Sequence, residues 1–570
     1  QVEAKAEDRL RGNPPYPHYM GAILVIPRGT YAFGRLEVLD VVDGQQRLTT
    51  FQTFLAALRD LARELNVLQT AELLEGMITN PEGPQVQERL ERFKLYPTAY
   101  DRKLYTDIID LTPDSLRQKY PDSFYKNGNV NETAELPLRA WGFLRNEAEE
   151  FISDGEEGSR NRRLNALAQA LLEDFLVIVI TLGERDDAQV IFETLNAGGE
   201  PLAAMDLVRN DVFHRATRAG ENVEALMEER WRTFEDPFWK EAGTRGRIKK
   251  PRIDFFLSDT LAAETGKEIL LTELYARYKA FVKERNFESV DSELRLLLKH
   301  APTYRKLASP TGSTPLERVA RQLAVFDVGT AYPLIFVIEA RNAPEAEKEA
   351  LYQLILSYVV RRMLCGLASK AYNNVFLRIA AQLRLEGATL AKGAEAFSLL
   401  SGDNMRFPDD NELRKNILHR KQYGSIQQAR LRHILAEFEL ASRDKFDEAT
   451  ELPDDLTIEH VMPDAWFEHW PLDDNTRVPS DLVTGMSEVQ LKSIAKREAL
   501  KNTLGNLTLL NGARNPSLGH QGFAVKRDKI AKSLLKLNHE IAEKTSWTES
   551  DIEKRGSRLA ELAVKIWPSP

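Results

Sequence analysis

Hydrophobic positions near the start of the chain follow two patterns. Apolar runs at 22–26 and 36–42, separated by a Pro- and Gly-containing turn at 27–30, predict a β-hairpin. From 48 to 65 the apolar residues recur every three or four positions, which is the spacing of an amphipathic helix. The second strand is therefore expected to pass into a helix N-terminus at the Asp43-Gly44 step.

Further along, the patterns alternate between irregular and regular segments. Residues 80–160 combine Pro- and Asn-containing stretches with helical pieces. The β-branched run 176–181 predicts a strand, and 187–195 predicts a short helix that ends before two glycines. Pro201 suits the first turn of a further helix, which is expected to run to about Phe213.

From about 220 to 440 nearly every segment has helical periodicity. Predicted helices in this region include 270–284, 315–324, 346–364 and 374–385. The segment 452–455, which contains proline and two aspartates, is a suitable entry to a last domain. We therefore predict a mostly helical α+β protein with domains at 1–220, 221–444 and 445–570.

Composition limits the class of protein. The hydrophobic share of 43% and charged share of 29% are ordinary for a soluble globular protein, and no apolar run approaches the ~20 residues that span a bilayer. The single cysteine, Cys365, excludes intramolecular disulfides and Cys-rich zinc sites and fits a reducing cytoplasm. A net charge of -9 argues against non-specific DNA coating, so nucleic-acid contacts are expected from local patches.

Charge is unevenly distributed. Residues 491–536 carry ten Lys or Arg against two acids, 244–252 carry five basic residues in nine, and 451–475 carry eight acids with no Lys or Arg. A basic run is usually a solvated face. The 491–536 run differs because it surrounds polar residues that suit catalysis.

The C-terminal segment contains groups that suit metal-dependent phosphodiester cleavage. His460 can be the base, because a neutral imidazole with a pKa near ~6.5 is available at pH 7. Glu459 and Asn515 offer hard oxygen ligands for Mg²⁺ or Mn²⁺. On a strand, Glu459 and His460 would point to opposite faces, so a twist or bulge would be needed for both to reach one phosphate.

Other polar residues complete this candidate site. Asn506, between Gly505 and the apolar strand 507–510, suits an asparagine that hydrogen-bonds backbone and holds the loop after His460. Lys526 and Arg527, with Lys529, fall on a predicted helix and could bind DNA phosphates. The alternative is a core histidine with turn asparagines; His520 is an alternative metal ligand, and His469 is expected at the surface.

The segment 43–47, Asp-Gly-Gln-Gln-Arg, is a second polar cluster between apolar elements. Gly44 permits a tight turn, helix N-terminal amides attract anions, and Arg47 can form two hydrogen bonds to a phosphate. Asp43 can hold a metal or polar group, and the amides of Gln45 and Gln46 can orient water or base edges. The alternative is an ordinary helix start with exposed glutamines.

The C-terminal motifs resemble the HNH (ββα-metal) nuclease family. They are most similar to the C-terminal domain of GmrSD-type modification-dependent restriction enzymes, where a (D/E)-His-(I/V)-x-Pro strand precedes Leu-Gly-Asn-Leu-x-Leu-Leu. Matching positions here are Glu459-His460-Val461-Met462-Pro463, Leu504-Gly-Asn-Leu-Thr-Leu-Leu510, Asn515 and Lys526. The resemblance covers about 445–570. It implies His460 as general base, Asn506 as positioning residue, and Glu459 with Asn515 as metal-side residues.

The N-terminal motifs resemble the ParB/sulfiredoxin-like domain of the same group, whose hallmark is Asp-Gly-Gln-Gln-Arg-Leu-Thr-Thr. A second hallmark matches at 192–202, followed by Asp206, and Arg361-Arg362 with Gly366 and Tyr372 matches a third pattern. The resemblance implies a nucleotide-binding, NTP-hydrolysing site, and its candidate residues are Asp43, Gly44, Gln45, Gln46, Arg47, Asn196 and Asp206. The family's Pro-x-Tyr-Gln-Arg segment is not found in 1–20, so either the given chain starts late or this member differs.

Together these features predict a single-chain, GmrSD-like DNA endonuclease of anti-phage defence, with double-stranded DNA and an NTP (GTP, ATP or UTP) as partners. A homo-oligomer is compatible with this prediction, and a membrane partner is not. The resemblance implies that the trigger is either phosphorothioate or glucosylated hydroxymethylcytosine. Tyr16, Pro17 and Tyr19 could contact sulfur, although a core position is favoured for them. Two alternatives are a ParB-like DNA-binding regulator with an inactive HNH fold, and an NTPase that acts on RNA.

Overall fold

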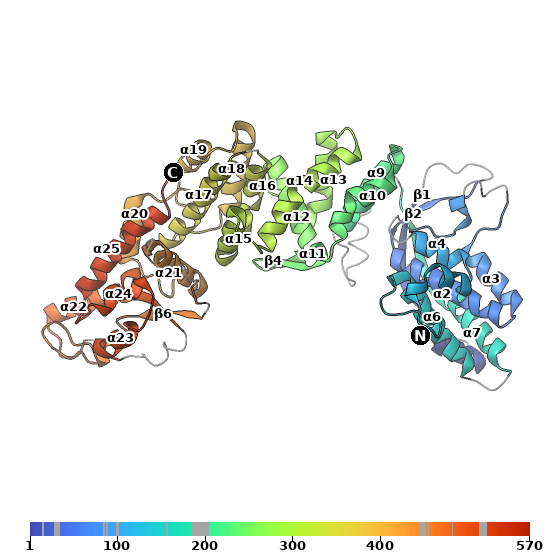
Figure 1. Cartoon of the computed structure of the whole chain (residues 1–570), viewed down its shortest axis with the longest axis horizontal. Helices are drawn as coiled ribbons and strands as arrows, with labels where there is room; N and C mark the ends of the chain where they lie inside the picture. Colours follow the sequence, from blue (N-terminus) through green and yellow to red (C-terminus); the bar gives the residue numbers. More distant parts are fainter. Residues whose placement is uncertain are drawn as a thin grey trace. The chain divides into compact units, whose positions relative to one another are not determined.

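The chain packs as two compact units in the computed structural model (Figure 1). The structure describes residues 1–13, 16–27, 35–83, 86, 89–97, 102–154, 158–183, 204–341, 343–443, 452–453, 455–481, 483–511 and 521–570. Unit 1 comprises 1–235 with 289–291, and unit 2 comprises 236–288 with 292–570. Where the sequence predicted three domains, the helical region and the C-terminal elements thus share one unit.

A three-stranded sheet forms in unit 1, in the order β2-β1-β3. Strand β1 (His18–Pro27) pairs antiparallel with β2 (Leu39–Asp43), as the predicted hairpin requires. Strand β3 (Phe175–Thr181), also predicted, pairs parallel with β1. Tyr16 and Tyr19 beside and on β1 are 88% and 66% exposed, so the core position favoured for them is wrong.

Helices make up the rest of unit 1. Their bounds are α1 Val2–Leu10, α2 Gln45–Glu64, α3 Leu68–Ile78, α4 Arg102–Asp110, α5 Pro113–Lys119, α6 Leu136–Ser153, α7 Arg160–Glu173, α9 Ala204–Arg218 and α10 Val223–Glu229. The predicted helix over 48–65 is α2, and the one after Pro201 is α9. Helix α1 was not predicted, because five of its nine residues are charged and only four are apolar.

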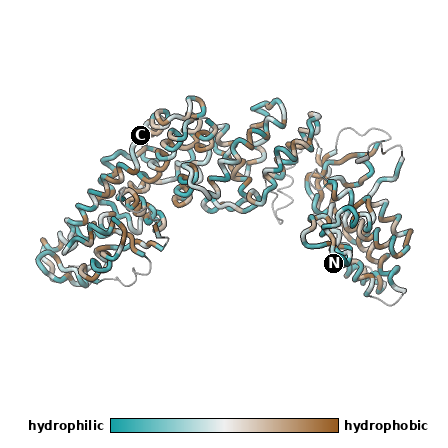
Figure 2. Tube along the Cα trace, in the orientation of Figure 1, coloured by the Kyte–Doolittle hydropathy of each residue, from teal (hydrophilic) through white to brown (hydrophobic). Residues whose placement is uncertain are grey.

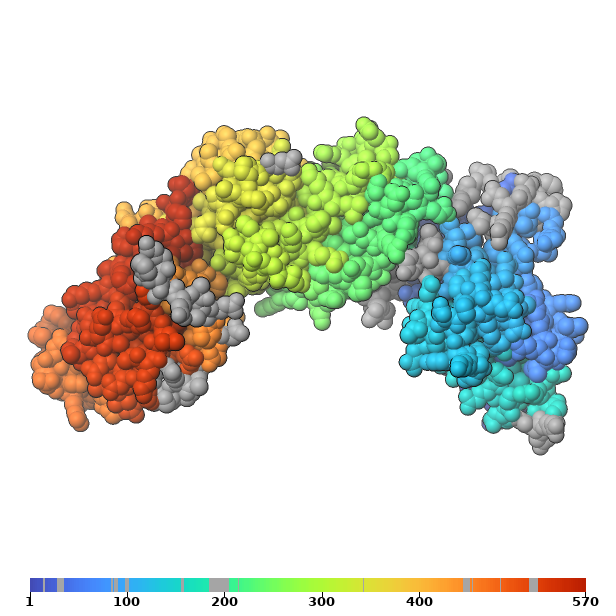
Figure 3. Space-filling model, in the orientation of Figure 1, coloured from blue at the N-terminus to red at the C-terminus, as the bar shows by residue number. Residues whose placement is uncertain are grey.

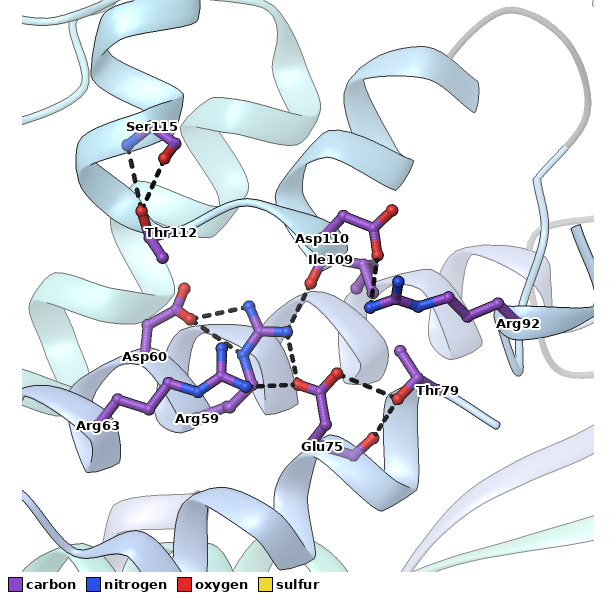
Figure 4. Close-up of polar contacts among 10 residues, drawn as sticks. All are labelled: Arg59, Asp60, Arg63, Glu75, Thr79, Arg92, Ile109, Asp110, Thr112 and Ser115. Atoms are coloured by element: carbon purple, nitrogen blue, oxygen red, sulfur yellow. Dashed lines mark hydrogen bonds and ion pairs between the residues drawn. The ribbon is translucent and has the colours of Figure 1, made fainter. Parts of the chain in front are cut away.

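The helical core of unit 1 encloses a buried arginine on α2 (Figure 4). Arg59 donates through Nε and Nη2 to Asp60 Oδ1 at 3.0 and 2.8 Å, and through Nη1 to Glu75 Oε2 at 3.0 Å. Burial raises the pKa of the Asp60 carboxyl, and Arg59 acts against this rise. Because Arg59 also donates to the Ile109 carbonyl at 2.5 Å, it ties α2, α3 and α4 together.

Unit 2 begins as a stack of helices in which hydrophobic and hydrophilic residues alternate along most of the trace (Figure 2). Their bounds are α11 Pro237–Lys240, α12 Arg252–Thr265, α13 Leu274–Arg285, α14 Val290–Ala308, α15 Pro315–Phe326, α16 Tyr332–Ala340, α17 Glu345–Leu364, α18 Tyr372–Glu386, α19 Leu390–Ser398, α20 Asp410–His419 and α21 Gln428–Ser442. The four helices expected at 270–284, 315–324, 346–364 and 374–385 are present as α13, α15, α17 and α18.

One part of this region is not helical. Strands β4 (Ala242–Arg245) and β5 (Ile248–Pro251) form a hairpin within the basic run 244–252. Arg245 donates from Nη1 to buried Asp259 at 2.7 Å, and Arg252 donates to Glu241 at 2.6 Å. Two of the five basic residues therefore serve internal ion pairs.

The C-terminal elements pack directly on the helical stack (Figure 3). They are β6 Leu456–His460, α22 Glu488–Leu500, β7 Leu507–Asn511, α23 Phe523–Ile530, α24 Lys536–Ala542 and α25 Glu549–Ile566. After α25 the chain docks on α17, where Arg361 Nε donates to the Trp567 carbonyl and Ser357 Oγ to the Pro568 carbonyl, both at 2.6 Å. These contacts therefore join the C-terminal elements to the helical stack.

The fold class is mostly helical with small sheets, in agreement with the predicted α+β class. Among the described residues, no helix is long and apolar enough to cross a membrane.

Candidate active site

Strands β6 and β7 place the Glu459-His460 pair at the centre of the C-terminal elements. They pair antiparallel, with Glu459 opposite Thr508 and His460 opposite Leu507. As side chains alternate along a strand, the two residues contact different groups. Glu459 is buried against α23, whereas His460 is half-buried and contacts the segment after α22.

Two neighbours hold the His460 ring. Its Nε2 lies 3.0 Å from Oδ1 of Asn502, and its ring centroid lies 4.3 Å from that of Tyr423 in an edge-on arrangement. Burial lowers the pKa of His460 below its usual value, with the Asn502 contact acting in the opposite direction. The imidazole is therefore neutral at pH 7, as a general base must be.

Neither neighbour was anticipated from the sequence. Tyr423 lies between α20 and α21, and its backbone N–H and that of Gln422 donate to the Asn502 carbonyl at 3.2 and 2.9 Å. Tyr423 stands 37 residues before His460 along the chain, and no local pattern connects the two. Asn502 directly follows Lys501 at the end of α22, where an asparagine is as readily a helix-end residue.

Glu459 forms a buried ion pair with Lys526. Lys526 Nζ lies 2.6 Å from Glu459 Oε1 and 2.7 Å from the His460 carbonyl oxygen, and the two side chains are 1% and 9% exposed. Burial raises the pKa of Glu459 and lowers that of Lys526, while their mutual attraction opposes both changes. This position differs from the exposed one expected of a phosphate-binding lysine.

Arg527, the neighbouring candidate for phosphate contact, is half-buried on α23. Its guanidinium donates to Asp528 at 3.1 Å. Its contact with DNA stays a prediction.

Asn506 makes the backbone contacts that were expected of it. Its side chain accepts from the Met462 N–H at 2.9 Å and donates to the carbonyls of Met462 and Lys501, both at 2.8 Å. Trp547 Nε1 also donates to Asn506 Oδ1 at 3.1 Å, and the Asn506 side chain is fully buried. These bonds fix the segment just after His460 relative to the end of α22.

Position 505, next to Asn506, requires glycine because α25 packs directly against its backbone. A Cβ at Gly505 would collide with the carbonyl oxygen of Ile552 on α25. Arg555, also on α25 and buried, donates to the carbonyls of Gly505 and Leu507 at 3.0 and 2.7 Å. Helix α25 therefore presses closely against the turn that positions Asn506.

The N-terminal cluster lies at the strand-to-helix junction that the sequence predicted. β2 ends at Asp43, Gly44 has φ +93°, and α2 begins at Gln45. A Cβ at Gly44 would lie 2.9 Å from Ile23 Cγ1 on β1, so the close approach of the helix start to the sheet requires glycine.

Arg47 is fixed against β1 and β2. Its Nη2 donates to Asp43 Oδ2 at 3.1 Å and its Nη1 to the Met20 carbonyl at 2.9 Å. Gln45 donates to the Val41 carbonyl at 2.9 Å, whereas Gln46 is exposed. The structure thus brings Asp43 and Arg47 together, with Gln46 at the surface beside them.

Several of the predicted site residues are not part of either cluster as the structure describes it. Asn196 and Asn515, with the alternative ligand His520 and the helix expected at 187–195, lie outside the described residues. Asp206 is exposed in the first turn of α9. Within the described part of the chain, no group of three or more His, Cys, Asp or Glu side chains could hold a metal ion.

Both ends of the chain match models of one protein family. Residues 7–213 match the GmrSD restriction endonuclease N-terminal domain, and residues 407–562 match the C-terminal domain of GmrSD restriction endonucleases. The first match includes the Asp43–Arg47 cluster, and the second includes Tyr423, His460 and Asn502. No curated protein matches the chain.

Proposed function

Because the chain belongs to the GmrSD restriction endonuclease family, we propose that it is a modification-dependent DNA endonuclease of anti-phage defence, with His460 as general base. The observation that carries this proposal is the setting of His460. Its ring is half-buried between Asn502 and Tyr423, and its pKa is lowered by burial, so that it can accept a proton at pH 7.

The contacts of His460 support different roles for its two ring nitrogens: Nε2 as a hydrogen-bond donor and Nδ1 as the base. The side-chain oxygen Oδ1 of Asn502 can only accept a hydrogen bond. It therefore favours the imidazole tautomer with the proton on Nε2. The Nδ1 lone pair is then free to take a proton from water. The water oxygen bonds to phosphorus, the bond to the leaving oxygen breaks, and the water proton passes to His460.

Mg²⁺ or Mn²⁺ is the proposed cofactor, held by Glu459 and Asn515. A divalent ion would stabilise charge on the scissile phosphate and the leaving oxygen. Glu459 has the hard oxygens that such ions prefer, but one of them already lies 2.6 Å from Lys526 Nζ. A metal ion bound to Glu459 would therefore compete with Lys526, so the described residues alone do not make a complete metal site.

An NTP, either GTP, ATP or UTP, is the proposed ligand of the Asp43–Arg47 cluster in unit 1. The guanidinium of Arg47 and the N-terminal amides of α2 suit phosphate oxygens. We propose that NTP binding or hydrolysis there accompanies recognition of modified double-stranded DNA, with phosphorothioate or glucosylated hydroxymethylcytosine as the trigger. Asn196 and Asp206 are the further proposed residues of this site.

Cleavage of plasmid DNA tests the proposal. The protein is incubated with unmodified, phosphorothioated and glucosyl-hydroxymethylated plasmids, with Mg²⁺, Mn²⁺ or EDTA, and with or without each NTP. We expect nicks or double-strand cuts in one modified plasmid, lost in EDTA. Hydrolysis of NTP without cutting of any plasmid would contradict the nuclease proposal and favour a regulator or an enzyme that acts on RNA.

The Asn502 contact leads to a prediction on the same substrate. Asn502→Leu keeps the branched shape of the side chain but removes the acceptor for His460 Nε2, and we expect cleavage to fall about 10-fold because the base is no longer oriented. Asn502→Asp retains an acceptor oxygen and is expected to stay within about 3-fold of wild type. The measurement is the single-turnover cleavage rate constant. Equal rates for the Leu and Asp variants would contradict the positioning role.

A further inference from the structure

A cavity of about 400 Å³ lies in unit 2, close to the candidate active site but separate from it. Its walls come from the ends of α15 and α17, the start of α18, the loop 420–427 between α20 and α21, and the start of α21. Part of its lining is apolar, contributed by Val359, Met363, Leu367 and Ile426. A concave site of this volume suits a small molecule better than the convex backbone of a DNA duplex.

Three cations line the same cavity. They are Lys370, Arg420 and Arg430, while Asp327, at an exposed position, is the acid among the described lining residues. Arg430 Nε is buried and has no hydrogen-bond partner within the described structure. Arg430 also lines the cavity, so its positive charge would attract an anion bound there, although Nε itself is closed off from solvent.

Gly366 brings one of these cations close to the backbone. It has φ +73°, and a Cβ on it would lie 2.5 Å from Arg420 Nε. The Arg420 guanidinium therefore packs on the backbone at the end of α17, at the cavity wall. A side chain at position 366 would displace Arg420.

We propose that this cavity binds a small phosphate-bearing ligand of nucleotide size. Lys370, Arg420 and Arg430 would hold the phosphates, and the apolar wall would hold the uncharged part of the ligand. The net positive lining indicates a ligand with phosphates. The apolar wall indicates a ligand that also has an uncharged part, because a bare anion would make no contact with that wall. The site is distinct from the Asp43–Arg47 cluster, which belongs to unit 1.

The cavity is connected to the candidate base by a short chain of contacts. Arg420 Nη1 donates to Gln422 Oε1 at 3.1 Å, and the Gln422 N–H donates to the Asn502 carbonyl at 2.9 Å. Asn502 Oδ1 in turn lies 3.0 Å from His460 Nε2. The loop 420–427 also carries Tyr423 against His460. A ligand on Arg420 would act on this loop through these contacts and thereby raise the cleavage rate, a consequence that rests on the proposed nuclease function.

Calorimetric titration of the full chain with ATP and with pyrophosphate tests the binding site without requiring cleavage. Arg47→Gln is used as background so that the proposed unit 1 site contributes little. We expect ATP binding to persist in this background and to weaken at least ~10-fold when Lys370→Gln and Arg430→Gln are added. We also expect ATP to bind more tightly than pyrophosphate, because only ATP uses the apolar wall.

Two further variants serve as controls for the ATP titration. Arg378→Gln, on the exposed face of α18, removes a cation outside the cavity and should leave the titration unchanged. Ser369→Glu, at an exposed lining position, adds a negative charge and should weaken binding about as much without removing Arg430. Undetectable ATP and pyrophosphate binding in the Arg47→Gln background would overturn the proposal. So would affinities that neither Ser369→Glu nor the double substitution changes.

Cleavage supplies the second readout. On the plasmid that the wild type cuts, ATP should raise the rate at least about 3-fold, and Ser369→Glu should reduce that increase whereas Arg378→Gln should not. ATP binding that the cavity variants weaken, without any effect on the rate, would overturn the connection to His460 but leave the binding site standing. If no plasmid is cut, the nuclease function fails while the titration still decides the binding site.

Discussion

His460→Ala is expected to lower the single-turnover rate constant for DNA cleavage by roughly 10²–10⁴-fold, which is the usual contribution of general acid–base catalysis. The imidazole accepts the proton of the attacking water in the proposed reaction, and the neighbouring Asn502 amide cannot replace it as a base. Because the ring is half-buried and has one side-chain hydrogen bond, the loss of stability should be only about 1–2 kcal/mol.

The matched control is His469→Ala, which removes an exposed histidine from the same unit and should leave cleavage unchanged. Circular dichroism melting of both variants checks that the fold is retained. Cleavage by folded His460→Ala protein at a rate within about 3-fold of wild type would assign the base to another residue. The nuclease function itself would then stand, and only the role of His460 would be lost.

Local patterns were sufficient to predict most of the positions around this site. The strand at Glu459-His460, the strand after Asn506 and the helix at Lys526 each follow from a few consecutive residues. At the other end, Gly44 between an apolar strand and a periodic helix indicated the junction that the structure has. The backbone role of Asn506 followed in the same way from its place after glycine and before a strand.

Contacts between segments that are distant in the sequence could not be predicted from local patterns. Tyr423 packs on His460 because the loop between α20 and α21 folds over the end of α22, and nothing within a few residues of Tyr423 indicates this. The burial of Lys526 was missed for a related reason. A lysine on a helix is usually exposed, and its buried partner, Glu459, stands 67 residues earlier. Such pairs depend on the tertiary fold rather than on local periodicity.

The Lys526 ion pair leads to the largest expected effect on stability. Lys526→Met fills the same space without a charge and leaves the Glu459 carboxylate buried without its cation. Removing one partner of a buried ion pair costs about 3–5 kcal/mol, so the free energy of unfolding should fall by that amount at pH 7. Denaturant titration of the full chain, followed through the unfolding of unit 2, measures the change. Lys492→Met breaks an exposed pair with Glu488 and should cost less than about 1 kcal/mol.

The double variant Glu459→Gln with Lys526→Met separates the unpaired charge from the lost packing. It removes both charges and should recover most of the stability, because the cost in the single variant comes from the carboxylate left alone.

The stability of the single variant should also change with pH in a direction set by Glu459. Burial raises the pKa of Glu459 above its value in the unfolded chain, so the folded state binds the proton more readily. The single variant should therefore gain stability relative to wild type as the pH falls from 8 to 5, and lose it as the pH rises. A single variant as stable as the double variant at pH 8 would mean that Glu459 reaches solvent, and that the Glu459–Lys526 pair does not hold β6 against α23.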